Sequence, residues 1–430
     1  MGCLRVACLR VSVSANDGNA MHNNHSFSEA ARRRGLIALL TDVFCMYTGF
    51  FMVVPLISVH YVDGLGWAAA SIGLVLGVRQ VTQQGLTLFG GVLADQIGAK
   101  WLICLGLAVR IVGFVVMAWA TTLPLLFLSV VLAAIGGALF ESPRAAAFAA
   151  LARPEERQRF YSLAGVIGGI GMAVGPLLGA VLLRVDFSVA ALVGAGFFTI
   201  NLVQTLIFLP AVRVASEPGR FGSGISLVLR NRPFIIYTLL LMGYWFMWVQ
   251  LTISLPLVAQ QLSGTSDGVG LIYAVNAGLT ILLQYPVLRF LSRRVEPMAL
   301  LSLGLVLMSV GLGAIALAHG IVGLVGCVII FSLGSLLVQP TQQTATASMA
   351  DPSALGTYFG VNALALALGG GLGNYTGGLL YGLGQQFATP ALPWLVFCAV
   401  GMASALGLAL LQHRQNSARA GASRDASSMV

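Results

Sequence analysis

Residues 101–145 read WLICLGLAVRIVGFVVMAWATTLPLLFLSVVLAAIGGALFESPRA. They contain two apolar runs, 101–121 and 124–145, and their charged residues are Arg110, Glu141 and Arg144. A run of roughly 20 mostly apolar residues has the length of an α-helix that crosses the hydrocarbon core of a bilayer. The stretch therefore predicts two membrane-spanning helices joined by a short turn.

The same pattern recurs along the whole chain. Cutting the sequence at charges, Pro and polar clusters gives twelve apolar segments: 35–58, 68–92, 101–121, 124–145, 162–183, 188–210, 233–256, 268–288, 298–318, 320–338, 360–383 and 393–412. Of the 430 residues, 58% are hydrophobic and 9% are charged, which excludes a soluble enzyme, a nucleic-acid-binding protein and a disordered chain. We expect an all-α integral membrane protein with twelve transmembrane helices in two six-helix halves.

Basic residues predict the orientation, because Lys and Arg collect in cytoplasmic loops. Of the 23 Lys and Arg residues, 20 fall on one side if both termini lie there, Arg184 falls on the other side, and Arg79 and Arg110 lie within spans. We expect a multi-pass protein of the inner cell membrane with both termini in the cytoplasm. Its parts are a cytoplasmic tail (1–34), a first half (35–210), a central cytoplasmic loop (211–232), a second half (233–412) and a second cytoplasmic tail (413–430). Contact with anionic lipid accounts for the net charge of +9, so no nucleic acid is needed as a partner.

The two halves resemble each other in sequence. Residues 143–161 parallel residues 340–358 at an offset of 197, with a Pro and a Tyr at the two ends. A second parallel, at an offset of 198, relates Gly171, Gly175 and Gly179 to Gly369, Gly373 and Gly377. The alternative is chance agreement in a chain with 52 Gly residues. Internal duplication is typical of secondary transporters.

Three charged residues lie deep within predicted spans, where insertion scales put the cost of each at about 2.5 to 3.5 kcal/mol. Asp42 lies inside the first span, and Arg79 and Arg110 lie near the middle of the second and third. We expect Asp42 to bind and release a coupled proton, because an acid at that depth can change charge as water reaches it. The alternative is a fixed ion pair between Asp42 and Arg79 that joins two helices. In a combined mechanism, Arg79 releases the acid when cargo binds.

Polar and aromatic side chains complete the expected cavity. Gln83 lies one turn after Arg79 and continues a polar strip on the second span. The seventh span supplies stacking surface with few fixed donors, through Tyr244, Trp248 and Gln250. Such a lining favours bulky, partly aromatic cargo, cations included, over a polyol. Asn276 of the eighth span is a further polar candidate. The alternatives are an aromatic belt at the membrane interface and a purely helix-joining role for Asn276.

The fifth span carries a regular spacing of small residues, Gly171-x-x-x-Gly175-Pro176-x-x-Gly179. The glycines place one face of the helix close to a neighbour, and Pro176 removes a backbone donor and favours a kink. A bend at this point could separate two arrangements of the helices. The alternative is close packing with no part in gating.

The segment after the second span reads GVLADQIGAK, and we expect a short loop there. It resembles the cytoplasmic signature G-x-L-A-D-x-x-G-x-K of the major facilitator superfamily, between the same two spans. The resemblance implies that Asp95 stabilises one access state, within a gating motif that consists of Gly91, Leu93, Asp95, Gly98 and Lys100. Gln96 and Ala99 stand where two basic residues are usual, so we expect Lys100 and Glu141 to form a reduced charge relay.

Further stretches resemble the drug/proton antiporter group of that superfamily. They are GFFMVVPLIS from Gly49, YVDGLGWAA from Tyr61, GVRQVTQQGL from Gly77 and FGGVLADQIGAK from Phe89. The glycine spacing of the fifth span also resembles the antiporter motif G-x-x-x-G-P-x-x-G-G, with Ala180 in the last position. The arginine that many members carry in the fourth span is missing from VVLAAIGGALF. The resemblance implies an exporter whose coupling does not use that arginine.

We therefore predict proton-coupled efflux, that is antiport, of amphiphilic small molecules and drugs by alternating access. The alternative is a facilitator or symporter for a specific nutrient or metabolite on the same fold. An enzyme is not expected, because the five His residues are too scattered for a metal site and no catalytic set shares one depth. We expect no metal and no cofactor beyond the proton gradient. The expected partners are a small-molecule substrate, protons and the lipid bilayer, with a monomer as the default state.

Overall fold

The computed structural model describes residues 28–211, 221–351 and 354–428, and every regular element in these ranges is helical. The helices up to residue 211 are α1 (Glu29–Ser58) with its π-helical extension η2 (Val59–Gly64), α2 (Ala69–Ile97), α3 (Ala99–Ala118), α4 (Leu123–Leu151), α5 (Pro154–Leu183) and α6 (Phe187–Phe208).

The helices after residue 220 follow the same plan with more interruptions. They are α7 (Phe221–Arg230), α8 (Arg232–Trp248), η3 (Val249–Leu251), α9 (Ser254–Ser263), α10 (Asp267–Leu291), α11 (Pro297–Ala314), η4 (Ile315–Leu317), α12 (Gly320–Met349), α13 (Leu355–Leu364), η6 (Ala365–Gly369), α14 (Gly370–Gln386) and α15 (Leu392–Ser428).

Local sequence explains where several of these helices begin. Pro occupies one of the first two positions of α4, α5, α8 and α11, where its missing N–H is not needed for a helical hydrogen bond. Asp186 precedes α6 and accepts a hydrogen bond of 2.7 Å from the backbone N–H of Ser188. That hydrogen bond lowers the pKa of Asp186. Ser28 caps α1 in the same way, through the N–H of Ala31.

The predicted spans coincide with these helices, but the expected loop at 91–100 is wrong. α2 continues to Ile97 because no Gly or Pro interrupts residues 92–97. The chain turns at Gly98, whose φ of 91° lies in the left-handed region that favours glycine, and α3 begins directly afterwards. Helix α7 lies within the stretch expected as the central loop, and α15 continues through the expected second tail.

Ten helical segments in the described ranges are long and apolar enough to cross a membrane. They account for ten of the twelve predicted spans. The other two are the polar helix α2 and the glycine-rich run from α13 through η6 to α14, which are also helical over the predicted lengths. The protein is therefore a multi-pass membrane protein.

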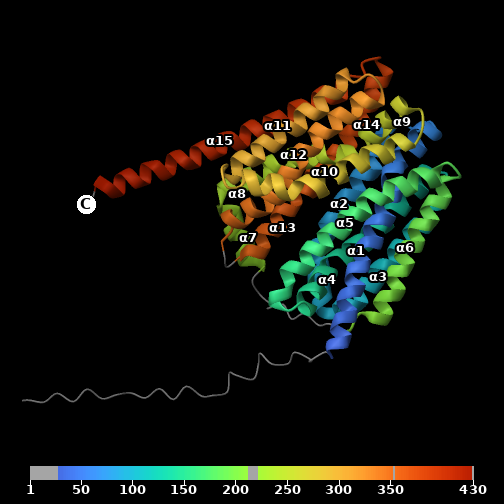
Figure 1. Ribbon diagram of the computed structural model, residues 1–430, viewed down its shortest axis with the longest axis horizontal. Helices are drawn as coiled ribbons and strands as arrows, with labels where there is room; N and C mark the ends of the chain where they lie inside the picture. Colours follow the sequence, from blue (N-terminus) through green and yellow to red (C-terminus); the bar gives the residue numbers. More distant parts are fainter. Residues whose placement is uncertain (1–27, 212–220, 352–353, 429–430) are drawn as a thin grey trace, which may run out of the picture.

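The helices form two packed groups (Figure 1). In the first, α1 packs on α5 and α6, and α4 packs on α2 and α3. In the second, α12 packs on α10 and α11, and α15 packs on α8 and α11. The two groups meet mainly where α2 lies against α14 and α5 against α10.

The internal repeat is confirmed in the packing of the helices. A Cβ atom at Gly106 of α3 would lie 2.7 Å from the carbonyl oxygen of Gly136 on α4. The residues 198 positions later behave alike, because a Cβ at Gly304 of α11 would lie 2.9 Å from the carbonyl oxygen of Gly334 on α12. Both pairs of helices thus approach at equivalent glycines. The two halves share one packing scheme.

Hydrogen bonds between the two groups gather at one end of the molecule. Within the described ranges, the Ser266 hydroxyl donates to the carbonyl oxygen of Ala180 over 3.1 Å, and Arg184 forms an ion pair with Asp267. The Asp267 carboxylate raises the pKa of Arg184. Deeper in the molecule, the Ser58 hydroxyl lies 3.4 Å from the carbonyl oxygen of Thr252. The halves are joined at the end that carries Arg184.

Candidate functional site

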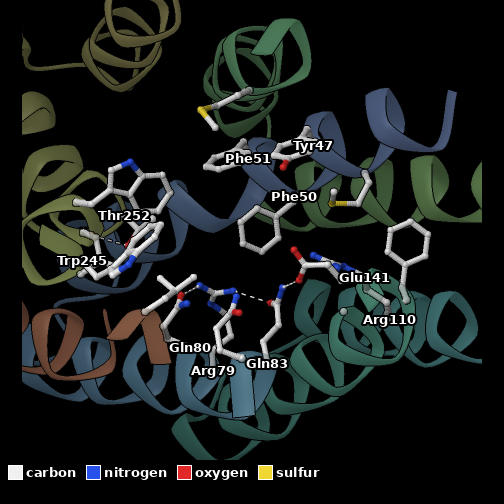
Figure 2. Close-up of a pocket in the computed structure, with 18 of the residues that line it drawn as sticks. Tyr47, Phe50, Phe51, Arg79, Gln80, Gln83, Arg110, Glu141, Trp245 and Thr252 are labelled. Atoms are coloured by element: carbon white, nitrogen blue, oxygen red, sulfur yellow. Dashed lines mark hydrogen bonds between the residues drawn. The ribbon is translucent and has the colours of Figure 1, made fainter. Parts of the chain in front are cut away.

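A cavity of about 180 Å³ lies between the two groups of helices (Figure 2). Helices α1 to α4 supply most of one wall, and α8 with the residues that follow it supplies much of the other. Its polar lining includes Arg79, Gln80, Gln83, Gln84, Arg110 and Glu141, and its rings include Tyr47, Phe50, Phe51, Phe140, Trp245 and Trp248. The cavity brings together charge and aromatic surface from both halves.

Arg79 comes from the middle of α2 and is only 7% exposed. Its Nη1 donates to Oε1 of Gln83 over 3.1 Å, and its Nη2 donates to Oε1 of Gln80 over 2.8 Å. Its Nε has no hydrogen-bond partner in the described part of the chain. The guanidinium also lies 5.0 Å from the ring centre of Phe50. The polar strip expected from the spacing of Arg79 and Gln83 is present and faces the cavity.

Arg110 reaches the cavity from α3 and is 2% exposed. Its guanidinium lies 5.2 Å from the ring centre of Phe50 and 4.8 Å from that of Phe198. Among the described residues it has no hydrogen-bonding or ion-pair partner. Gly137 of α4 leaves room for it, since a Cβ there would lie 2.8 Å from Nη1 of Arg110. Ring faces thus take the place that anions usually fill around a buried guanidinium.

Glu141 is the acid of this cavity, which corrects the role expected for it. Its Oε2 lies 3.5 Å from Nε2 of Gln83 (Figure 2). Lys100, its expected relay partner, instead donates from Nζ to the carbonyl oxygen of Leu206 over 2.8 Å. The physical reason is that α4 continues to Leu151, so Glu141 lies well inside the helix and not at its cytoplasmic end.

Asp42 lies elsewhere, and the alternative of a fixed ion pair with Arg79 is wrong, because the carboxylate contacts α6 instead. The side chain is completely buried, and its carboxylate accepts hydrogen bonds from Nε2 of Gln204 and, over 3.2 Å, from the hydroxyl of Thr205. Asn201 donates to the backbone carbonyl of Asp42 over 3.3 Å. These three partners come from α6, which packs on α1. Gln204 and Thr205 satisfy the carboxylate without a cation, and Asp42 does not line the cavity.

The aromatic walls of the cavity are related by the internal repeat. Tyr47 and Phe50 of α1 correspond, 198 residues later, to Trp245 and Trp248 of α8, and all four line the cavity. Trp245 and Trp248 contact each other edge to face, with ring centres 5.7 Å apart. These rings therefore face a cavity rather than a membrane interface. Tyr244 is fully buried behind Trp245, outside the lining.

A second cavity of about 340 Å³ adjoins the first and shares with it the lining residues Tyr47, Met172, Trp248 and Gln339. None of the described residues that line it is charged. One side of this cavity is lined by glycines of α5. The other side is lined by amide and hydroxyl side chains of α10 and α12, which include Asn276, Thr280, Gln284, Ser335 and Gln343. Asn276 also donates to the hydroxyl of Ser332 over 2.9 Å, so it both lines this space and joins two helices.

Other predicted residues have structural contacts. Gln250 is buried, and its Nε2 donates to the carbonyl oxygens of Phe246 and Gly373 over 2.8 and 3.0 Å, so it joins α8 to α14. In the gating motif, Leu93 is half-buried and Gly98 forms the turn before α3. The side-chain surroundings of Gly91 and Asp95 lie outside the described part of the chain. A gating role for this motif stays a prediction.

The glycines of α5 face α1. A Cβ at Gly171 would lie 2.9 Å from Cβ of Tyr47, and one at Gly175 would lie 2.8 Å from the carbonyl oxygen of Thr48. Gly179 lies against the carbonyl oxygen of Met52. Pro176 stands within the unbroken helix α5. The structure shows the close packing that the small residues predict, and a bend at Pro176 stays a prediction.

Sequence reasoning missed Glu141 as the acid of the cavity. The signal was present in residues 145–151, AAAFAAL, which contain no helix breaker and carry α4 onward. Reading the span only to residue 145 placed Glu141 near its end. A longer helix would have placed the acid at the depth of the polar strip on α2.

The fold and the charged cavity between its two halves define a class of membrane transporter. The sequence profile of the Major Facilitator Superfamily matches residues 40–374, and the chain belongs to this superfamily. Its fold is therefore the twelve-helix fold of that superfamily. The protein is a transporter of small molecules and not an enzyme.

Particular relatives are similar over nearly the full length. The chain is 40% identical to "Multidrug resistance protein MdtH" of Photorhabdus laumondii over 390 residues, which cover 91% of this chain and 96% of the relative. The protein of the same name from Proteus mirabilis is 38% identical over 90% of this chain and 95% of its own length. A solved POT family transporter in complex with 5-aminolevulinic acid shares the fold, with a TM-score of 0.76 at 15% identity over 89% of this chain and 96% of its own. The solved nucleoside transporter NupG gives a TM-score of 0.71 at 15% identity, over 87% of this chain and 98% of its own.

Proposed function

We propose that this protein exports amphiphilic small molecules from the cytoplasm, across the inner cell membrane, in exchange for protons. Relatives about 40% identical carry the name multidrug resistance protein, which supports drugs as cargo and export as the direction. The observation that carries the coupling is the position of Glu141, an acid that shares an aromatic-lined cavity with two buried arginines. Glu141 takes the role that the sequence assigned to Asp42.

Charge balance in the cavity supports exchange. Arg79, Arg110 and ionised Glu141 give the lining a net charge of +1, and Glu141 is its counter-charge for a cationic cargo. Protonation of Glu141 removes that counter-charge and leaves +2. Proton and cargo then exclude each other, which is the condition for antiport. Ring faces of Phe50, Trp245 and Trp248 hold the apolar part of the cargo.

Alternating access follows from where the halves are joined. With both termini in the cytoplasm, the end that carries Arg184 and Asp267 faces outward, so that the outer side is closed by their ion pair and by Ser266. We propose that the halves 35–210 and 233–412 move as units, and that the segment from Gly91 to Lys100 stabilises the state that is open to the outside. One chain is enough to form the transport site, because both walls of the cavity come from it.

Transport into purified proteoliposomes tests the proposal. The probe is rhodamine 6G, an aromatic cation whose charge does not change near neutral pH, with the membrane potential held at zero by valinomycin and equal potassium. Exchange predicts accumulation in vesicles with an acidic lumen, above that in protein-free vesicles. Accumulation in vesicles with an alkaline lumen would instead indicate the symporter, and equilibration without accumulation would indicate a facilitator.

A further inference from the structure

Gln83 stands between the acid and one of the arginines. Its Oε1 accepts the hydrogen bond from Nη1 of Arg79 over 3.1 Å, and its Nε2 lies 3.5 Å from Oε2 of Glu141. The three side chains form one chain of contacts across the cavity, from α2 to α4 (Figure 2). The amide is the element that links the state of Glu141 to the position of Arg79.

Donor and acceptor chemistry fixes the orientation of this amide. A guanidinium only donates and an ionised carboxylate only accepts, so the carbonyl of Gln83 must face Arg79 and its NH₂ must face Glu141. A protonated Glu141 can donate. The Gln83 carbonyl can then turn toward it, which presents the NH₂ group to Arg79 and sets two donors against each other.

We propose that Gln83 is a positioning residue that converts protonation of Glu141 into release of Arg79. With Glu141 ionised, Gln83 and Gln80 hold the two terminal nitrogens of Arg79. With Glu141 protonated, Arg79 loses its partner at Gln83. The Nε of Arg79 already has no hydrogen-bond partner among the described residues, so Gln80 is then the main hydrogen-bond partner of the guanidinium. The freed guanidinium moves toward the ring of Phe50, where cargo binds.

The surroundings of Glu141 leave this link as its direct hydrogen-bonded contact. The helices packed on α4 are α1, α2 and α3, and the titratable and charged groups that they turn toward Glu141 are Tyr47, Arg79 and Arg110. Arg144 lies one turn further along α4 itself. Within the described ranges, none of the arginines comes within 4.0 Å of a Glu141 oxygen. Gln83 is the side chain that bridges the gap. The inference rests on the proposed exchange and deepens it.

Binding of rhodamine 6G in nanodiscs at pH 5.5 and pH 8 tests this role, with affinity measured by fluorescence anisotropy. The ratio of the two affinities is the readout, because a merely structural residue changes affinity without changing the ratio. Loss of a hydrogen bond to a charged group corresponds to roughly tenfold or more in affinity. Wild type is expected to bind at least about tenfold more weakly at pH 5.5. Gln83→Met, which keeps the length of the side chain but neither donates nor accepts strongly, is expected to cut that ratio to about a third or less.

Three further variants sharpen the result. Gln80→Met is the matched control, since Gln80 also accepts from Arg79 but does not touch Glu141, and its pH ratio is expected to stay that of wild type. Gln83→Asn keeps the amide but is too short to bridge, so it should reproduce Gln83→Met and serves if that variant folds poorly. In an Arg79→Gln background, Gln83→Met should have no further effect on the ratio.

The failure of this inference is distinguishable from failure of the exchange itself. A pH ratio that survives Gln83→Met and Gln83→Asn but disappears in Glu141→Gln would overturn the relay and leave the exchange standing. An additive effect in the Arg79→Gln background would overturn it as well. A wild-type protein with no pH ratio would overturn both.

Discussion

The close approach of α5 to α1 gives a prediction whose size can be worked from distances. In Gly175→Ala, the new Cβ would lie 2.8 Å from the carbonyl oxygen of Thr48 and 3.0 Å from the backbone nitrogen of Met52. Both are backbone atoms, so no side chain can turn away. Ordinary contact begins at 3.4 Å, so α5 must move by about 0.6 Å from α1, which carries Tyr47 and Phe50 of the cavity wall.

The energy follows from two opposing effects. Overpacking of this kind costs roughly 1 to 3 kcal/mol, while replacing a helical Gly by Ala gains about 1 kcal/mol. Gly165→Ala on the same helix is the matched control, because a Cβ there has nothing within 4 Å. Since both variants gain the same helix propensity, the difference between them isolates the packing cost, and Gly175→Ala should be less stable than Gly165→Ala by about 1 to 3 kcal/mol.

Reversible unfolding in mixed micelles, followed by tryptophan fluorescence, measures this difference. Gly373→Ala extends the test, because Gly373 is the repeat partner of Gly175 and a Cβ there would lie 2.7 Å from the carbonyl oxygen of Phe246. It should behave like Gly175→Ala. Equal stability of Gly175→Ala and Gly165→Ala would refute the reasoning that α1 and α5 are held at glycine distance.

Three other predictions concern residues outside the cavity. The side chains of Arg184 and Asp267 are 60% and 50% exposed, so water screens their ion pair and it is weak. Arg184→Asp should raise the outward-open population by about fivefold at most, measured by distances between spin labels on α5 and α10. Adding Asp267→Arg should restore the wild-type population, and a double variant that behaves like Arg184→Asp would contradict a role for the pair. Asp42→Asn should lower stability by about 1 to 3 kcal/mol, because one of the two Asp42 oxygens that accept hydrogen bonds from α6 becomes an NH₂ group, which only donates. Unchanged unfolding would count against these contacts. The hydrogen bond from Arg32 lowers the pKa of Glu156 in the folded protein. This hydrogen bond therefore stabilises the fold fully above the unfolded pKa near 4.5, and the stabilisation is lost as pH falls through the lower folded pKa. Glu156→Gln should lower the thermal midpoint more at pH 7 than at pH 4, and an equal effect at both pH values would contradict this.

Much of the fold could be predicted because it depends on apolar length, which a sequence states directly. The predicted spans match the helices even at the short turn of His319 and Gly320, where α12 begins. The repeat was also visible, since glycines at equivalent positions serve equivalent helix contacts. Errors arose where polar residues continue a helix beyond the bilayer, as in the segment from Gly91 to Lys100.

The candidate site was predicted less completely because side-chain direction depends on tertiary packing. Arg79, Gln83 and Arg110 could be found, since a charge or polar strip within an apolar span needs a cavity. Asp42 met the same criterion, yet its partners are amides and hydroxyls of α6, which a sequence does not place next to it. Glu141 was expected near the end of its span and not in the cavity, because its depth depends on where α4 ends.

The most direct test of the central claim compares two acids in the same vesicles. Accumulation of rhodamine 6G driven by an acidic lumen is measured for Glu141→Gln and Asp42→Asn, with cargo exchange at equal pH as the control for folding and binding. We predict that Glu141→Gln exchanges cargo but no longer accumulates it, while Asp42→Asn still accumulates it. Accumulation that persists in Glu141→Gln and disappears in Asp42→Asn would contradict the account.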